Sequence, residues 1–145
     1  MVDRLQDFAY SLSDGSITTL GSDLAGADRT VGRLVALLGE PDYDYVVLQR
    51  IPEGVHFYDF TGKDVPFLHA AGTAETMIIE WGRYGDGGEW KLSTLFHRAP
   101  SDSGQAGGEA RFRSDEAAEI FRTYLRTEAP PTGYGLRDHD VSQYR

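Results

Sequence analysis

Apolar residues recur at helical spacing in two segments of the first third of the chain. Residues 2–12 place them on one stripe, which predicts a short amphipathic helix. Residues 28–38 repeat the pattern between Asp28, a good N-cap, and Gly39, a frequent helix stop. Between the two predicted helices, residues 17–20 have the composition of a short strand. We expect the apolar face of each helix to pack on a common core.

The middle of the chain changes to β-branched and aromatic runs separated by turn residues. Residues 45–48, 55–58 and 65–68 have the composition of strands in a meander. Longer strands are predicted at residues 76–81 and 90–97, joined by a glycine-rich turn that supplies the positive φ of a hairpin. Side chains alternate along the last of these strands, so one of its faces should be wetter than the other. The sequence therefore predicts a sheet of about five antiparallel strands.

One more helix and two irregular segments complete the expected order of elements. Ser114 is the predicted N-cap of a helix with a broad apolar face, which should lie across the sheet. Residues 98–110 are rich in Gly, Ser and Pro and predict a flexible loop, and residues 137–145 predict a flexible tail. The chain is thus expected to be a single α+β domain over residues 1–145, with helices near the N-terminus and one C-terminal helix.

The charge balance changes the range of expected partners. The chain holds 14 Lys and Arg against 23 Asp and Glu, a formal net charge of -9 at pH 7. This charge repels phosphate backbones and anionic membrane surfaces, so neither nucleic acid nor a membrane is an expected partner. It suits a basic protein partner, although acidity also serves solubility. With no cysteine, no signal-peptide pattern and no apolar stretch of membrane-spanning length, the cytoplasm is the expected compartment.

Glycine and serine patterns give no anchor for an enzyme. The glycine-rich segment 85–88 lacks the Lys-Ser/Thr ending of a phosphate loop and opens onto a strand, so a hairpin turn explains it better. No serine lies in the Gly-x-Ser-x-Gly setting of a nucleophile elbow. We therefore predict neither catalysis nor a bound cofactor.

The four histidines are the remaining candidates for metal or acid–base chemistry. His56, His69, His97 and His139 lack the helical spacing of a zinc site. Histidines on strands could converge in space, but we interpret each as a partly exposed or hydrogen-bonded residue and predict no metal site. The segment 138–140, Asp-His-Asp, has the composition of an oriented base, yet its place in the tail favours a solvated segment.

Tyrosines and carboxylates gather on two predicted loops. Rigid aromatic rings and acidic groups together are typical of protein-binding surfaces. The alternative for the tyrosines of the first loop, Tyr43 and Tyr45, is that they cover the edge of the core. The predicted partner-binding residues are Asp42, Tyr43, Asp44, Tyr84, Asp86 and Glu89.

The end of the chain resembles a known group of proteins. Residues 112–127 contain the predicted helix that Ser114 caps, and with residues 130–137 they carry the pattern Y-x-R-T…P-x-G-Y-x-L-R. This part of the chain resembles the C-terminal part of certain actinobacterial immunity proteins. These are antitoxins encoded beside secreted polymorphic toxins, including a group similar to the antitoxin of a mycobacterial NAD-hydrolysing toxin. The resemblance implies a stoichiometric inhibitor that covers the active site of a basic toxin domain in the cytoplasm of the producing cell.

Two other functions fit the expected order of elements. In a helix-grip domain, a curved sheet would wrap the last helix and enclose a small ligand in an aromatic interior. An acidic secretion chaperone or adaptor would form a stable homodimer through a helix.

Overall fold

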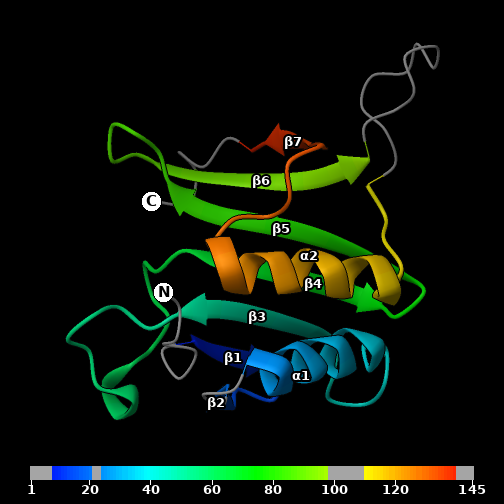
Figure 1. Ribbon diagram of the computed structural model, residues 1–145, viewed down its shortest axis with the longest axis horizontal. Helices are drawn as coiled ribbons and strands as arrows, with labels where there is room; N and C mark the ends of the chain where they lie inside the picture. Colours follow the sequence, from blue (N-terminus) through cyan, green and yellow to red (C-terminus); the bar gives the residue numbers. More distant parts are fainter. Residues whose placement is uncertain (1–7, 21–23, 98–109, 140–145) are drawn as a thin grey trace.

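The computed structural model describes residues 8–20, 24–97 and 110–139, which form one antiparallel sheet and two helices (Figure 1). The seven strands lie in the order β2-β1-β3-β4-β5-β6-β7. The α+β class and the antiparallel sheet with the last helix packed on it are confirmed, with seven strands where about five were expected. The elements are β1 (Phe8–Leu12), β2 (Ile17–Thr19), α1 (Leu24–Ala36), β3 (Tyr45–Arg50), β4 (Phe67–Thr73), β5 (Thr76–Tyr84), β6 (Trp90–His97), α2 (Ser114–Thr127) and β7 (Tyr134–Asp138).

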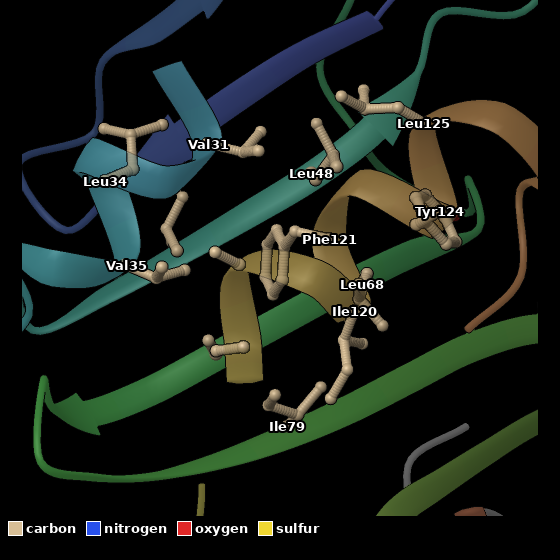
Figure 2. Close-up of a cluster of buried hydrophobic side chains, with 14 of the residues drawn as sticks. Val31, Leu34, Val35, Leu48, Leu68, Ile79, Ile120, Phe121, Tyr124 and Leu125 are labelled. Carbon is tan, nitrogen blue, oxygen red and sulfur yellow. The ribbon is translucent and has the colours of Figure 1, made fainter. Parts of the chain in front are cut away.

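Both helices cover the same face of the sheet (Figure 1). Their apolar stripes meet the inward side chains of β3, β4 and β5, as Figure 2 shows. At the centre of this core, Leu68, Ile79, Ile120 and Phe121 are each at most 1% exposed. Burial of one such side chain stabilises the fold by roughly 1.5–3 kcal/mol relative to leaving it in water. The space between α2 and the sheet is therefore filled by side chains.

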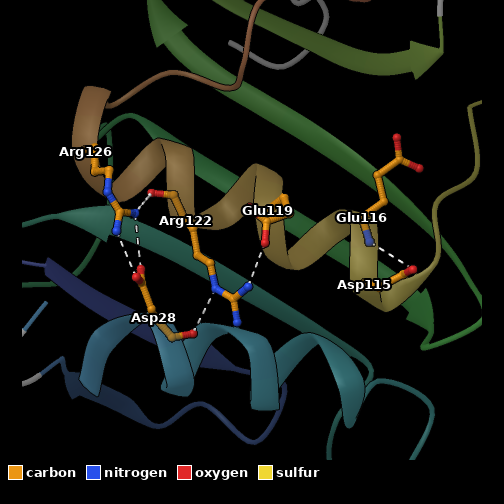
Figure 3. Close-up of polar contacts among 6 residues, drawn as sticks. All are labelled: Asp28, Asp115, Glu116, Glu119, Arg122 and Arg126. Atoms are coloured by element: carbon orange, nitrogen blue, oxygen red, sulfur yellow. Dashed lines mark hydrogen bonds and ion pairs between the residues drawn. The ribbon is translucent and has the colours of Figure 1, made fainter. Parts of the chain in front are cut away.

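A polar clamp joins the two helices along their outer edge (Figure 3). The guanidinium of Arg126 donates two hydrogen bonds to the carboxylate of Asp28, at 3.2 and 2.8 Å. Arg122 donates to the backbone oxygen of Asp28 at 3.3 Å, and its guanidinium lies where a Cβ on Gly32 would be only 2.8 Å away. The prediction of Asp28 as the N-cap of this helix is wrong, because α1 begins at Leu24. The side chain of Asp28 binds α2 instead.

The predicted helix at residues 2–12 is wrong for the part that the structure describes. Residues 8–12 form β1, which pairs with β2 through a hairpin closed by a hydrogen bond from the Leu12 amide to the Ser16 oxygen. Between them, Gly15 adopts a φ of 89°, and an Asp-Gly pair is a strong hairpin signal. The five residues of β1 are too few to distinguish strand spacing from helix spacing, so the turn and the pairing with β2 and β3 decide their structure.

The predicted strand at residues 55–58 is also wrong. This segment belongs to a long connection from β3 to β4 that contains one 3-10 turn, Phe57–Asp59. The side chain of Gln49 holds the connection by donating to the oxygens of Gly62 and Val65, at 2.9 and 3.2 Å. Pro52 and the positive φ of Gly54, 86°, interrupt the extended conformation that a ladder needs.

The expectations for the last third of the chain are corrected in two places. Ser114 is the first residue of α2 and not its N-cap, since Arg113 holds that position without a side-chain cap hydrogen bond. Residues 137–139 of the predicted tail lie along the edge of the sheet, because β7 pairs with β6 and the His139 amide donates to the Leu92 oxygen at 2.8 Å. Residues 98–109 of the predicted loop and residues 140–145 lie outside the described residues.

Candidate functional site: the open face of the sheet

The two sets of predicted partner-binding residues lie at opposite ends of the sheet. The first set is Asp42, Tyr43 and Asp44, and the second is Tyr84, Asp86 and Glu89. The first set leads into Tyr45 at the start of β3, which is level with Ile78 of β5 through the pairing with β4. Tyr84 is six positions further along β5, about 20 Å in an extended strand. Figure 1 shows this separation, with the β5–β6 turn at the upper left and the start of β3 on the right.

The segment before β3 is held by the side chain of Ser13, which binds its backbone. The Ser13 hydroxyl donates to the Asp42 oxygen at 2.7 Å and accepts from the Asp44 amide at 3.1 Å. Tyr43 packs against the edge of the main core, which is the alternative considered for this tyrosine. The carboxylates of Asp42 and Asp44 remain exposed.

The β5–β6 turn forms the predicted hairpin. The Gly85 amide donates to the Glu89 oxygen at 2.7 Å, and the exposed Asp86 and Glu89 lie at the turn. Tyr84 is 47% exposed, and its hydroxyl donates to the backbone oxygen of Asp64 in the β3–β4 connection at 2.8 Å. Tyr84 therefore links the β5–β6 hairpin to the β3–β4 connection.

The face of the sheet opposite the helices, called here the open face, carries a continuous row of rings. Their positions are the outward ones in the register, since the neighbouring residues Leu68 and Ile79 point into the core. Successive ring centroids are 5.5, 6.4, 6.0 and 4.9 Å apart. The members of this aromatic row, in order, are Tyr45, His69, Phe67, Trp90 and Tyr84.

A glycine makes room for the centre of the aromatic row. Gly82 pairs with Phe67 across β4 and β5. A Cβ at Gly82 would lie 2.5 Å from the ring of Phe67 and 2.8 Å from that of Trp90. The two rings therefore fold over the bare backbone of β5, and only glycine permits this arrangement.

A polar group lies beside the aromatic row and is called here the Glu80 cluster. Oε1 of Glu80 is 3.6 Å from Nδ1 of His69, and Oε2 is 3.8 Å from Nε2 of His139. The same Nε2 of His139 is 2.6 Å from Oγ1 of Thr94. The cluster thus draws its members from β4, β5, β6 and the residue after β7. Two of the four histidines, His69 and His139, thus lie close to one carboxylate although they are far apart in the sequence.

The environment of Glu80 favours its ionised form. The contact with His69 holds the pKa of Glu80 below its usual value, against the opposing effect of partial burial. Coulombic interaction with His69 and His139 and the nearby Thr94 hydroxyl lower the pKa of Glu80 further. Glu80 therefore presents a negative charge on the open face at neutral pH.

A shallow depression of about 340 Å³ lies between the aromatic row and the β3–β4 connection. Tyr45, Phe67, His69 and Glu80 line one part of it, and Gln49 and Gly62 line another. Near the end of α2, a second depression of about 340 Å³ is lined by Arg50 and Glu128, which form an ion pair and so neutralise each other. The first depression is the stronger candidate site because, among the described residues, the ion pairs of its carboxylate are with imidazoles and not with an arginine or lysine.

The other two histidines serve different contacts. The His56 ring stacks on Tyr58 at 5.1 Å. On the helix-covered side, His97 binds Glu116 at 2.8 Å, and the Tyr134 hydroxyl donates to the second oxygen of Glu116 at 2.6 Å. Burial and this carboxylate raise the pKa of Tyr134. These contacts tie the start of α2 to β6 and β7.

The Asp-His-Asp segment does not act as a unit where the structure describes it. Asp138 accepts a hydrogen bond from Ser93 on the helix-covered side, whereas His139 binds the Glu80 cluster on the open face. Neighbouring residues of an extended chain point to opposite faces, so Asp138 cannot orient His139. Among residues 8–20, 24–97 and 110–139, no group of three His, Asp or Glu side chains is arranged to hold a metal ion.

Comparisons with known protein families, curated proteins and solved structures give no match for this chain. Within the described residues, neither helix has the length and apolar character needed to cross a membrane.

Proposed function

We propose that the chain is a stoichiometric protein inhibitor, of the immunity type, that binds a basic toxin domain through the open face of its sheet. The observation that carries this proposal is the aromatic row beside the ionised Glu80 on a face that neither helix covers. Such a protein acts by covering its partner and performs no catalysis of its own.

Aromatic residues and a carboxylate make complementary contributions to such an interface. Tyrosine and tryptophan supply large rigid contact areas and are enriched among the residues that dominate binding energy. The net charge of -9 steers a positively charged partner toward the chain and disfavours acidic partners. A toxin that acts on phosphate-containing substrates needs a positive cleft, which an acidic protein can block. The resemblance to immunity proteins supports the same class.

The helix-grip alternative has less support in the structure. Its ligand would need space between the last helix and the sheet, where Phe121 is 1% exposed and Ile120 and Leu68 are fully buried. The depression at Glu80 lies on the other face and opens to solvent. The secretion-chaperone alternative requires an apolar helix surface for a second copy, but α1 and α2 direct their buried faces to the sheet and the clamp joins them to each other.

The test is co-expression with the toxin domain encoded in the neighbouring reading frame. The wild-type chain should restore growth and form a 1:1 complex in calorimetry. Tyr45→Ala and Tyr84→Ala, at the two ends of the aromatic row, should each weaken binding by about 1–4 kcal/mol if they are central contacts. Leu136→Ala is the control, because Leu136 is 40% exposed but lies on the helix-covered side of the sheet. Its partner in the β6–β7 pairing is the core residue Leu95.

Two outcomes would contradict the proposal. The first is a toxin domain that binds the wild-type chain and both tyrosine variants equally well. The second is selective loss of binding in Leu136→Ala, which would place the interface on the helix-covered side. Circular dichroism of each variant shows whether the fold is retained.

A further inference from the structure

We propose that the depression at Glu80 is a receptor for a single guanidinium group, which an arginine side chain of the basic partner inserts between the aromatic row and the Glu80 carboxylate. This inference rests on the proposed function and names the chemistry by which the open face recognises its partner.

The geometry of the depression matches the two recognition modes of a guanidinium. This group is planar, stacks on aromatic faces and donates paired hydrogen bonds to a carboxylate. Tyr45 and Phe67 lie on either side of His69 in the aromatic row, and both line the depression together with Glu80. A planar cation that enters it thus meets ring surfaces and a carboxylate within one volume of about 340 Å³.

The Glu80 carboxylate retains the capacity to accept such a ligand. Its separations from the imidazole nitrogens, 3.6 Å to His69 and 3.8 Å to His139, exceed hydrogen-bond length. A charge-assisted bond from a guanidinium would be shorter and stronger than either contact. The carboxylate is also ionised at neutral pH, so it offers a full negative charge.

One cation in the described part of this face, Arg137, occupies a different place. Arg137 pairs with Thr94 across β6 and β7, but its guanidinium lies over the ring of Phe96, 5.0 Å from the centroid. The structure therefore shows that an outward ring of this sheet accepts a stacked guanidinium, while Glu80 itself contacts only His69 and His139 among the described ion pairs.

The receptor can be tested on the full chain without the toxin. A ¹⁵N-labelled sample is titrated with N-acetyl-arginine amide and followed by NMR, with N-acetyl-citrulline amide as the neutral ligand of nearly the same shape. Arginine amide should shift the amide signals of β4 and β5 around His69 and Glu80 in a saturable way. Citrulline amide should bind about tenfold more weakly, since it lacks the charge that strengthens the hydrogen bonds.

Two variants assign the effect to the carboxylate. Glu80→Gln keeps the shape and should weaken arginine amide binding by about tenfold. Glu75→Gln removes the same charge from the exposed β4–β5 turn and should leave binding unchanged. A dispersed spectrum for each variant confirms that the fold is intact. Equal binding of the two amides, or equal binding by Glu80→Gln and the wild type, overturns the receptor.

Binding of the toxin domain separates failure of the receptor from failure of the proposed function. If Glu80→Gln binds the toxin as the wild type does while Tyr45→Ala and Tyr84→Ala lose affinity, the receptor is refuted and the open face remains the interface. If none of the three variants changes toxin binding, the proposed function fails together with the receptor.

Discussion

The two faces of the sheet are built from the same strands but differ in chemistry. On β4, Leu68 points to the helices and is fully buried, whereas the adjacent His69 and Phe67 are half-buried on the open face. On β5, Ile79 and Glu80 show the same contrast. The helix-covered face is a dry core, and the open face combines rings with an ionised carboxylate. The helix-covered face therefore holds the main core, whereas the open face holds a smaller buried cluster of Ala9, Ile51 and Phe60 beside partly exposed rings.

The largest difference in stability between the two faces is expected when a ring on each face is truncated to alanine. Phe121→Ala in α2 removes a ring that is 1% exposed and should lower the free energy of unfolding by about 3–5 kcal/mol. Tyr45→Ala on the open face should cost much less, because water already reaches its ring. Urea unfolding of both variants measures the contrast. Equal losses would mean that the open face is a second core.

A smaller loss of stability is expected for a substitution at Gly82, where the aromatic row lies over the backbone of β5. Gly82→Ala places a methyl group within 2.5 Å of the Phe67 ring, and displacement of the rings should cost about 1–3 kcal/mol. Trp90 fluorescence should change with it. The double variant Gly82→Ala with Phe67→Ala should lose less stability than the two single changes added together. Strict additivity would show that the rings do not pack over Gly82.

The smallest expected effect is the pH dependence of the contribution of Glu80 to the free energy of unfolding. The pKa of Glu80 is lowered in the folded state, so its contribution to stability is complete above the usual value of 4.5 and is lost as pH falls through the lower folded value. Because the group is partly exposed, wild type and Glu80→Gln should differ by at most about 1 kcal/mol. Their difference, from urea unfolding at several pH values, should shrink on acidification below pH 4.5. A difference that grows on acidification would contradict the lowered pKa.

Local patterns predicted those parts of the fold in which neighbouring residues decide the structure. The glycines of the β5–β6 turn and the apolar face of α2 are examples, and alternation along β6 correctly separated Leu92 from Leu95. The predicted N-terminal helix was wrong because five residues fit both the helix and the strand period, and the turn at Gly15 together with pairing to β2 and β3 decides for a strand.

The open face could not be predicted because its members are distant in the sequence. His139 reaches Glu80 only because β7 adds to the edge of the sheet, which the composition of the last residues did not reveal. The aromatic row depends on the register of β3 to β6, and a shift of one residue would turn His69 toward the core. Of the predicted partner-binding residues, Tyr84 alone belongs to this row.

The most direct test of the open face as the binding surface is an NMR footprint of the bound toxin domain. Amide signals of the labelled chain are compared with and without the unlabelled toxin, and solvent exposure of side chains is probed in the same complex. We expect protection of Tyr45, Phe67, Glu80 and Trp90, while exposed groups of the helix-covered side such as Glu119 and Leu136 remain accessible. Protection of Glu119 and Leu136 with an unchanged open face would contradict the open face as the binding surface.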